Sequence, residues 1–368
     1  METMMKNKIS IREATDKDSE IWDEFVKDNS GSFYQCYKWR FVYEKQGVKT
    51  FYLMANDEKN SINGVFPFVK VPMFLNDSMH SVPIGGAYGG PLGRSGEIVT
   101  ALMERMSEIC VKEMVTYSNI LMNPHINNTE LITCCSSMKY KPIYTTENAP
   151  KTFVLNTQDY ETIWKKSFNT KVRNQVRKAK KNGVEIIRND WSMLDKYYSI
   201  LVENRKKLKT RIIRREIFYK ILDLFREHTE LYLALYKHEL IAGAYCFDFQ
   251  NIRYLFDNVS IPEYMKYCPN NLLYSEMIKD ACSESDINKF DFGSTAPNSS
   301  HFHWKKQYGG TPVPLQYYEK TYSPAKKLLR EKTVRPRVMI RKLIWSKLVS
   351  PEQINKMSPK MRKFLEWF

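Results

Sequence analysis

The sequence predicts two successive α/β domains, each a mixed, mostly antiparallel sheet flanked by helices. The chain has 368 residues, which is too long for one ordinary domain and sufficient for two with separate cores. Apolar residues make up 43% and aromatic residues 13%, as in a globular protein. The order of strand and helix patterns also starts again after residue 150. We therefore expect domains at 1–150 and 151–322, followed by a basic helical tail at 323–368.

The first half begins with short alternating and amphipathic segments. They predict a strand, a helix, a hairpin and a long helix, at 8–13, 16–27, 50–71 and 96–117. Before the long helix, five glycines fall within 83–93, so the backbone there should approach a neighbour closely. This loop is either a connector between strand and helix or a ligand-binding loop, and the pattern leaves both readings open.

The second half repeats this design at greater length. Strands are predicted at 152–155, 184–188, 231–237, 241–249, 252–258 and 289–292, and helices at 160–182, 192–207, 215–228 and 271–284. The three strands between 231 and 258 form a meander. Both halves thus run as strand, helices, antiparallel strands, helix and strand.

Several classes of protein are disfavoured by composition. No run of 18 apolar residues occurs, and the first 20 residues lack the apolar stretch of a signal peptide, so we expect a cytoplasmic protein. The seven cysteines are scattered without a CxxC pair or a nearby histidine cluster. Neither disulfides nor a metal site is expected.

The net charge of +16 predicts an anionic partner. Ten of these charges lie in 321–368, which holds 13 Lys or Arg and three Glu. Ser323, Ser350 and Ser358 each precede a proline, which predicts three short helices in the tail. The basic amphipathic segment 338–349 suits either peripheral contact with an anionic inner membrane face or packing on the protein's own body.

The segment 165–181 carries eight basic residues and no acid. As a helix it would pack through Val172, Val176 and Ala179 and present Arg173, Arg177 and Lys180 as a ridge on another side. The ridge is either a solvated face or a site for an anionic ligand. Arginine suits the second reading because its planar fork binds phosphate oxygens with two hydrogen bonds.

A second candidate site follows the strand near 290. The stretch Phe290–Gly310 opens from an apolar strand into a small polar loop and then places Lys305 between Trp304 and Tyr308. Binding sites are often built at such a strand end. Without further context, a lysine between aromatic residues can simply lie over their apolar surface.

These segments together resemble the Fem family of tRNA-dependent aminoacyl ligases. W-K-x-x-Y-G from Trp304 is similar to the closing motif of that family, and K-x-R-x-x-V-R-K-A-x-K-x-G-V at 171–184 is similar to the opening of its second domain. Further similar segments are Ser32–Trp39, Tyr88–Leu92 and Pro269–Leu273. The resemblance extends from about Ile9 to Tyr318.

The resemblance implies two acetyltransferase-like (GNAT-like) domains in tandem that bind a peptidoglycan precursor. The enzyme would form an amide bond by transferring an aminoacyl group from aminoacyl-tRNA to an amine of this UDP- or lipid-linked envelope precursor, without a cofactor. The carried-over substrate-binding residues are Lys38, Trp39, Tyr88, Arg173, Arg177, Lys180, Trp304 and Tyr308, with the two arginines on the phosphates. Lys305 would stabilise charge at the reacting ester. Asp291 is either the base that takes the proton of the amine or the cap of a turn.

The sequence departs from two patterns. The helical hairpin that some Fem members insert in the second domain is missing, which limits the subtype rather than the family. The glycine-rich loop of coenzyme A-dependent acetyltransferases is also missing, and Tyr267–Asn271 occupies its place, which disfavours coenzyme A without excluding it. One alternative is an acyl-CoA-dependent or acyl-carrier-dependent N-acyltransferase acting on an amino sugar or lipid-linked saccharide of a surface polysaccharide. Another is a non-catalytic nucleic-acid or membrane-binding protein that uses the basic segments.

Overall fold

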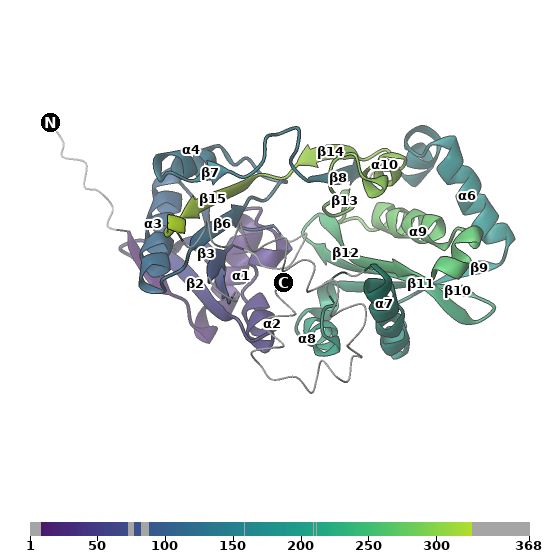
Figure 1. Ribbon diagram of the computed structural model, residues 1–368, viewed down its shortest axis with the longest axis horizontal. Helices are drawn as coiled ribbons and strands as arrows, with labels where there is room; N and C mark the ends of the chain where they lie inside the picture. The colour runs from purple at the N-terminus through teal and green to yellow at the C-terminus, as the bar shows by residue number, and fades with distance from the viewer. Residues whose placement is uncertain are drawn as a thin grey trace. The chain divides into compact units, whose positions relative to one another are not determined.

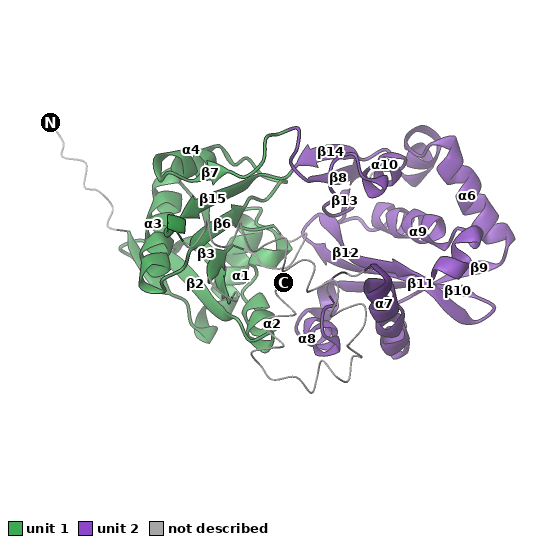
Figure 2. Ribbon diagram, viewed as in Figure 1, with its two compact units in different colours: residues 1–146, 315–338, 359–368 green, residues 147–314, 339–358 purple. Residues whose placement is uncertain are grey.

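The computed structural model describes residues 9–72, 77–81, 88–157, 159–208, 210 and 212–325. It divides into two compact units (Figure 2): the first runs up to Thr146 and takes in the chain again from Leu315, and the second is Glu147–Pro314. The glycine-rich stretch before Tyr88 and the three helices predicted for the tail lie outside the described residues.

The first unit is a mixed sheet with helices packed against it (Figure 1). Its strands are β1 (Ser10–Glu13), β2 (Lys49–Asn56), β3 (Ile62–Val71), β4 (Ser78–His80), β5 (Leu92–Gly93), β6 (Tyr117–Leu121), β7 (Lys141–Pro142) and β15 (Tyr317–Thr321). The order across the sheet is β1-β2-β3-β4-β6-β15-β7, with β5 also on β3. Its helices are α1 (Ser19–Asp28), α2 (Trp39–Lys45), α3 (Gly96–Lys112) and α4 (Thr129–Ser137). The helix α2 and the strands after α3 had no counterpart in the sequence prediction.

Helix α3 shows how local sequence sets an element in this unit. The Ser95 side chain accepts the Ile98 amide and caps its first turn. Leu102, Met103 and Met106, at helical spacing, are fully buried against the sheet. The predicted helix at 96–117 ends early, at Lys112, because the chain then turns and Tyr117 begins β6.

The second unit is built on a seven-stranded sheet of order β14-β8-β13-β12-β11-β10-β9. Its strands are β8 (Lys151–Asn156), β9 (Val184–Arg188), β10 (Thr229–Tyr236), β11 (Glu239–Phe249), β12 (Ile252–Ser260), β13 (Lys289–Asp291) and β14 (Thr311–Pro314). Its helices are α5 (Tyr160–Thr162), α6 (Thr170–Lys181), α7 (Leu194–Leu208), α8 (Arg215–Phe225), α9 (Pro269–Ser283) and α10 (Ser300–Lys306). The predicted meander is confirmed as β10, β11 and β12, which pair in antiparallel order.

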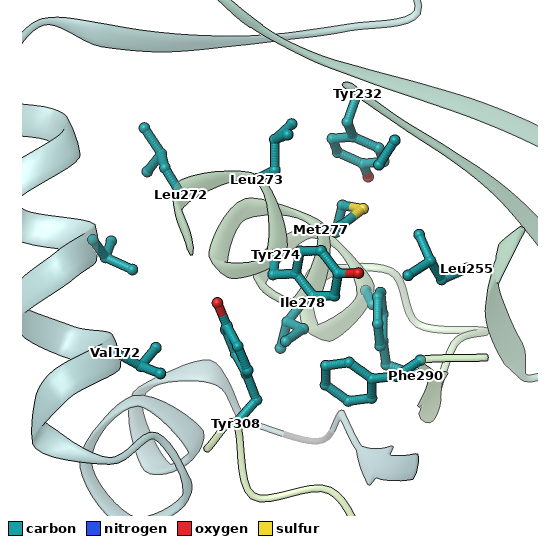
Figure 3. Packing of buried hydrophobic residues seen from close by; sticks show 14 of the residues in the cluster. Val172, Tyr232, Leu255, Leu272, Leu273, Tyr274, Met277, Ile278, Phe290 and Tyr308 are labelled. Atoms are coloured by element: carbon teal, nitrogen blue, oxygen red, sulfur yellow. The ribbon is translucent and has the colours of Figure 1, made fainter. Parts of the chain in front are cut away.

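Side-chain alternation in β11 separates the two faces of this sheet. Ala242, Ala244 and Cys246 pack into a core with α6 and α9. Gly243 points the opposite way, where a Cβ atom would meet the ring of Tyr197 in α7 at 2.6 Å. Figure 3 shows residues of α9 and of neighbouring strands packed in the core that α6 and α9 share on one face of the sheet.

The long helix predicted at 160–182 is interrupted in the structure. A short π-helical turn at Ile163–Ser167 follows α5, and α6 begins afresh at Thr170. The Asn169 side chain accepts the Val172 amide at 2.8 Å, so asparagine acts here as an N-cap rather than as a helix-interior residue.

The division of the chain differs from the predicted boundaries at 150 and 322. The first unit ends at Thr146, and Tyr317–Thr321 forms β15 of the first sheet, paired with β6 and β7. Tyr317 therefore belongs to the first unit although it follows the whole of the second in sequence. The sequence pattern of a single short strand does not reveal which sheet the strand joins, because strand pairing depends on contacts with residues distant in sequence.

Candidate functional site

The candidate site lies in the second unit where β12 and β13 stop pairing. The parallel register covers only Ile252–Tyr254 opposite Lys289–Asp291. Strand β12 continues to Ser260 while β13 ends at Asp291, so β13 offers Leu255–Ser260 no β-partner. Gly293 lies against this edge, since a Cβ atom on it would be 3.1 Å from the Leu255 carbonyl oxygen. Side chains take part of this edge, since the Asn258 amide donates to Asp257 Oδ1 at 2.8 Å and Asn204 Nδ2 donates to the Ser260 carbonyl oxygen at 3.3 Å.

Lys305 reaches the same place from α10. Its Nζ atom donates to the carbonyl oxygens of Gly293 at 2.8 Å and Ser294 at 3.3 Å. The side chain is only 7% exposed. Burial lowers the pKa of Lys305 to about 8, and the negative charge of Asp291 opposes this effect. The fold thus holds the Lys305 cation, which is costly to bury, on the turn that follows β13.

Asp291 organises the turn that holds Lys305. Its Oδ1 atom accepts the Gly293 amide at 2.7 Å and also the Thr152 hydroxyl, and the side chain is buried. Of the two roles considered for this carboxylate, these contacts are those of a turn cap. Asp291 therefore fixes the carbonyl groups that bind Lys305, and its charge acts on the ammonium group.

Trp304 and Tyr308 form part of the core beside this turn. The ring of Trp304 meets the rings of Tyr274 and Tyr308 at centroid distances of 4.5 and 4.8 Å. Tyr308 is fully buried, next to Tyr274 and Phe290 beside α9 (Figure 3). Its hydroxyl accepts from Asn271 in the first turn of α9 at 3.0 Å. Both aromatic residues thus support α10, and Trp304 remains half-buried.

Three residues near Lys305 were missed by the sequence analysis. Arg205 of α7 pairs with the buried Asp257 of β12 at 2.5 Å. Partial burial, then the positive charges of Lys305 and Arg205, lower the pKa of His301 in α10. The site therefore gathers basic groups from two helices around the open edge of β12. Nothing in the local pattern of α7 distinguishes Arg205 from the other basic residues beside it.

The basic helix α6 differs from the ridge that its sequence predicts. Arg173 donates to the carbonyl oxygens of Trp164, Lys165 and Phe168, so its guanidinium caps the preceding turn. Lys180 pairs with Glu276 of α9 at 2.8 Å.

Arg177 is the exposed arginine of the ridge. Its guanidinium lies 5.6 Å from the centre of the Trp164 ring, and one nitrogen donates to Asn174. The helix packs through Val172, Val176 and Ala179 as predicted. Among the three predicted ridge residues, Arg177 is the one that pairs with no backbone carbonyl or carboxylate of the residues that the structure describes.

The three site residues predicted in the first unit have different environments. Lys38 is exposed. Trp39 is fully buried and packs on Phe33 and Tyr43, so its ring belongs to the core rather than to a ligand-facing surface. Tyr88 is also buried, with its ring beside His125 and its carbonyl oxygen accepting from a serine hydroxyl. Aromatic residues in a motif are frequently core residues, and spacing alone does not separate the two.

Two negative findings concern the described residues alone. They contain no group of three or more His, Cys, Asp or Glu side chains placed to bind a metal ion. No helix among them is both long and apolar enough to cross a bilayer.

Part of the second unit is similar to the acetyltransferase class. Residues 166–306 match the family model of the acetyltransferase (GNAT) domain. This segment runs from the turn before α6 to the end of α10 and includes Lys305. Curated proteins gave no match to the sequence.

Solved structures resemble the chain over most of its length. FemX aligns with a TM-score of 0.68 at 15% identity, over 88% of this chain and 99% of that chain. L-PGS from Bacillus licheniformis aligns with a TM-score of 0.57 at 9% identity, over 88% and 97% of the two chains. A tandem GNAT protein from the clavulanic acid biosynthesis pathway also gives 0.57 at 9% identity, over 86% and 99%. The predicted fold of two GNAT-like domains in tandem is therefore confirmed, and the resemblance to the Fem family holds for the fold.

Proposed function

We propose that this protein is an acyltransferase that forms an amide bond, moving an aminoacyl group from aminoacyl-tRNA to an amine of a peptidoglycan or related cell-envelope precursor. The observation that carries the proposal is the buried Lys305, whose Nζ atom donates to the carbonyl oxygens of Gly293 and Ser294 where β13 ends. The likeness in fold to FemX and L-PGS supports the choice of an aminoacyl group.

The proposed chemistry needs positioning and charge rather than a nucleophilic side chain. The unprotonated amine attacks the ester carbonyl, and negative charge develops on the carbonyl oxygen. The ester bond then breaks, the tRNA hydroxyl leaves with a proton, and the amine loses one. The Lys305 ammonium group, fixed by two backbone carbonyls, is a preorganised cation for that oxygen. Burial strengthens such an interaction because the local dielectric is low.

The acceptor site is proposed to use Arg177 of the second unit. Its guanidinium is exposed and suits the phosphates of a UDP- or lipid-linked precursor. Lys38 of the first unit is also exposed and is proposed separately as a contact of the precursor. Peripheral contact of the tail with an anionic membrane surface would agree with a lipid-linked acceptor.

An acyl-CoA donor is the second candidate. The GNAT family match and the likeness to the tandem GNAT protein favour it. Helix α9 begins at Pro269 after its N-cap residue Cys268, however, and residues 261–272 contain no glycine. A loop without glycine is poorly suited to wrap backbone amides around a pyrophosphate.

Radiolabelled acyl transfer to UDP-linked muramyl pentapeptide tests the proposal. The donors are a mixture of charged tRNAs and, separately, acetyl-CoA. We expect product with the charged tRNAs that disappears after ribonuclease treatment. Lys305→Met should lower kcat by roughly 10²- to 10³-fold, the cost of losing one oxyanion donor. Lys306→Met alters the exposed neighbour in α10 and should leave the rate unchanged.

Acceptor binding is tested separately by calorimetry with Arg177→Ala. We expect weaker binding of the precursor at an unchanged melting temperature. Arg173→Ala is a poor probe because it also removes the cap of the turn before α6. Ribonuclease-resistant transfer from acetyl-CoA would overturn the proposal in favour of the second candidate.

A further inference from the structure

A short π-helical turn at Ile163–Ser167, the π turn, precedes the basic helix α6. It is closed by a hydrogen bond from the Phe168 amide to the Ile163 carbonyl oxygen at 2.9 Å. Turns of this kind are rare and are found frequently at functional sites. The π turn also interrupts a segment whose sequence predicts one continuous helix, so contacts elsewhere in the fold must favour it.

The side chain of Arg173 in α6 holds the π turn. One guanidinium nitrogen donates to the carbonyl oxygens of Trp164 at 3.3 Å and Lys165 at 3.1 Å, and also to that of Phe168. The other terminal nitrogen donates to the Thr170 hydroxyl at 3.1 Å. The end of a helical turn leaves carbonyl groups without helical partners, and a planar fork with several donors can satisfy them together. These contacts occupy the donors of Arg173 that a phosphate would need.

The residues that follow the π turn lie against the end of α10. The Asn169 amide donates to the Gln307 carbonyl oxygen at 3.0 Å. The rings of Phe168 and Tyr308 meet edge to face, with centroids 5.2 Å apart. The Tyr308 amide in turn donates to the Lys305 carbonyl oxygen at 3.1 Å. A short series of contacts therefore joins the π turn to the backbone of the residue that bears the buried ammonium group.

Lys305 is consequently held at two ends. Its Nζ atom donates to the carbonyl oxygens of the turn after β13, and its backbone belongs to the last turn of α10. Because one side chain connects these two supports, a displacement of the α10 backbone would move the ammonium group relative to the turn. A misplacement of about 1 Å at a reacting centre can lower a rate by roughly 10²-fold.

We propose that Arg173 is a positioning residue that fixes Lys305 through the π turn and the end of α10. The importance of this position for catalysis rests on the function proposed above. The two arginines of the basic motif then have separate roles, since Arg177 is exposed and is the proposed phosphate contact. Substitution of Arg173 should therefore change kcat, and substitution of Arg177 should change precursor binding.

The kinetic test is a double-mutant cycle in the acyl-transfer assay. Arg173→Lys keeps the positive charge but not the fork, and it should lower kcat roughly tenfold with an unchanged Kd for the precursor. Added to Lys305→Met, the same substitution should cause no further loss, because the side chain that it positions is gone. Arg188→Lys is the matched control, because Arg188 at the end of β9 pairs with Glu230 and Glu284, away from α10. It should lower Tm and leave kcat unchanged, which separates a loss of stability from a loss of position.

Chemical labelling of Lys305 tests the inference without acyl transfer. Limiting acetic anhydride, followed by tandem mass spectrometry, compares the modification of Lys305 with that of the exposed Lys306 in the same chain. We expect a low ratio in the wild type and a ratio several-fold higher in Arg173→Lys, since a displaced α10 exposes the buried amine. Phe168→Leu removes the ring contact with Tyr308 but keeps the carbonyl groups that Arg173 binds, and it should raise the ratio as well.

The inference is overturned by a labelling ratio that stays at the wild-type value in both variants. It is also overturned if Arg173→Lys lowers kcat equally with and without Lys305. A weaker precursor affinity at unchanged kcat in Arg173→Lys would instead make Arg173 a phosphate contact. A raised labelling ratio in a protein that transfers no acyl group would uphold the positioning of Lys305 and refute the proposed function.

Discussion

At the scale of single residues, the proposed function depends most on the burial, hydrogen bonds and pKa of Lys305. Its ammonium group is buried and donates hydrogen bonds to two backbone carbonyl oxygens. The negative charge of Asp291 raises its pKa. The pKa of about 8 means that this charge is lost near physiological pH rather than far above it. Under the proposed role of Lys305, activity would be sensitive to pH in a range that is easily measured.

The first prediction concerns the alkaline limb of the pH profile. If the protonated Lys305 serves the reaction, kcat/KM falls as pH rises through about 8. Asp291→Asn removes the negative charge that raises the Lys305 pKa, and the amide oxygen can still accept from Gly293. In Asp291→Asn the alkaline limb should therefore move to lower pH. At pH 6.5 the variant should keep nearly the wild-type activity, and at pH 8 its activity should be several-fold below that of the wild type. An unshifted limb would show that Lys305 does not act as the cation.

The second prediction concerns Asp23 in α1, which the sequence analysis did not single out. Its carboxylate accepts the Tyr37 amide at 2.6 Å. Burial raises its pKa to about 6, against the smaller opposing effects of that hydrogen bond and of the charges of Lys38 and Lys27. A raised carboxyl pKa means that the folded state holds its proton more tightly than the unfolded state. The contribution of the protonated Asp23 carboxyl to the free energy of unfolding is thus fully present below pH 4. It is lost as pH rises from about 4 to 6.

Asp23→Asn removes this charge and preserves an oxygen acceptor for the Tyr37 amide. At pH 7 the variant should be more stable than the wild type by roughly 1–2 kcal/mol. The difference should shrink toward zero at pH 4. Urea denaturation of both proteins across this range measures it, and a difference independent of pH would contradict the assignment.

At the scale of elements, the turn before α6 and the turn after α10 support one another. Arg173 caps the carbonyls of the first turn, while the Asn169 amide donates to the Gln307 carbonyl at 3.0 Å. Gly309 follows with φ of +85°, and a Cβ atom on it would lie 2.5 Å from Ser167 Cβ and 2.9 Å from Ser167 Cα. The close approach explains why glycine occupies this position beside Tyr308.

The third prediction compares two glycines with similar backbone conformations. Gly309→Ala meets the Ser167 backbone and should cost roughly 2–4 kcal/mol of unfolding free energy. Gly183 has φ of +78°, and nothing lies within 4 Å of a Cβ atom added there. Gly183→Ala should therefore lower the free energy of unfolding only by the conformational cost of about 1 kcal/mol. Thermal or urea unfolding distinguishes them, and equal losses would refute the close contact at Gly309.

At the scale of the whole molecule, the path of the chain decides what can fold alone. The second unit is continuous from Glu147 to Pro314, and all seven strands of its sheet lie within that range. The first unit is not continuous, because β15 lies between β6 and β7 and arrives only after the second unit is complete.

The fourth prediction follows from this arrangement. A fragment of residues 147–314 should fold cooperatively, with a sharp urea transition. A fragment ending at Thr146 lacks β15, which leaves β6 with an unpaired edge, and it should be aggregation-prone or largely unfolded. Adding a peptide of residues 315–325 in trans should increase its protection from proteolysis. A stable first fragment without the peptide would show that β15 is dispensable.

Local sequence patterns were sufficient to predict the class of fold and the position of the motif around Lys305. Period-two and period-3.6 patterns depend only on which side chains are apolar, so the meander of β10 to β12 and the packing face of α6 could be predicted. Lys305 stood out because of its aromatic neighbours and its likeness to a family motif. These are local properties of the chain.

The other features depend on contacts between residues distant in sequence, and packing and charge select those contacts. Tertiary structure placed β15 in the first sheet, buried Trp39 and Tyr88, engaged Arg173 with backbone carbonyls, and made Asp291 a turn cap. It also brought Arg205 and His301 toward Lys305 and stacked Tyr236 on Tyr267. A sequence pattern gives the type of a side chain, but whether that side chain is free to bind depends on contacts that only the folded chain makes.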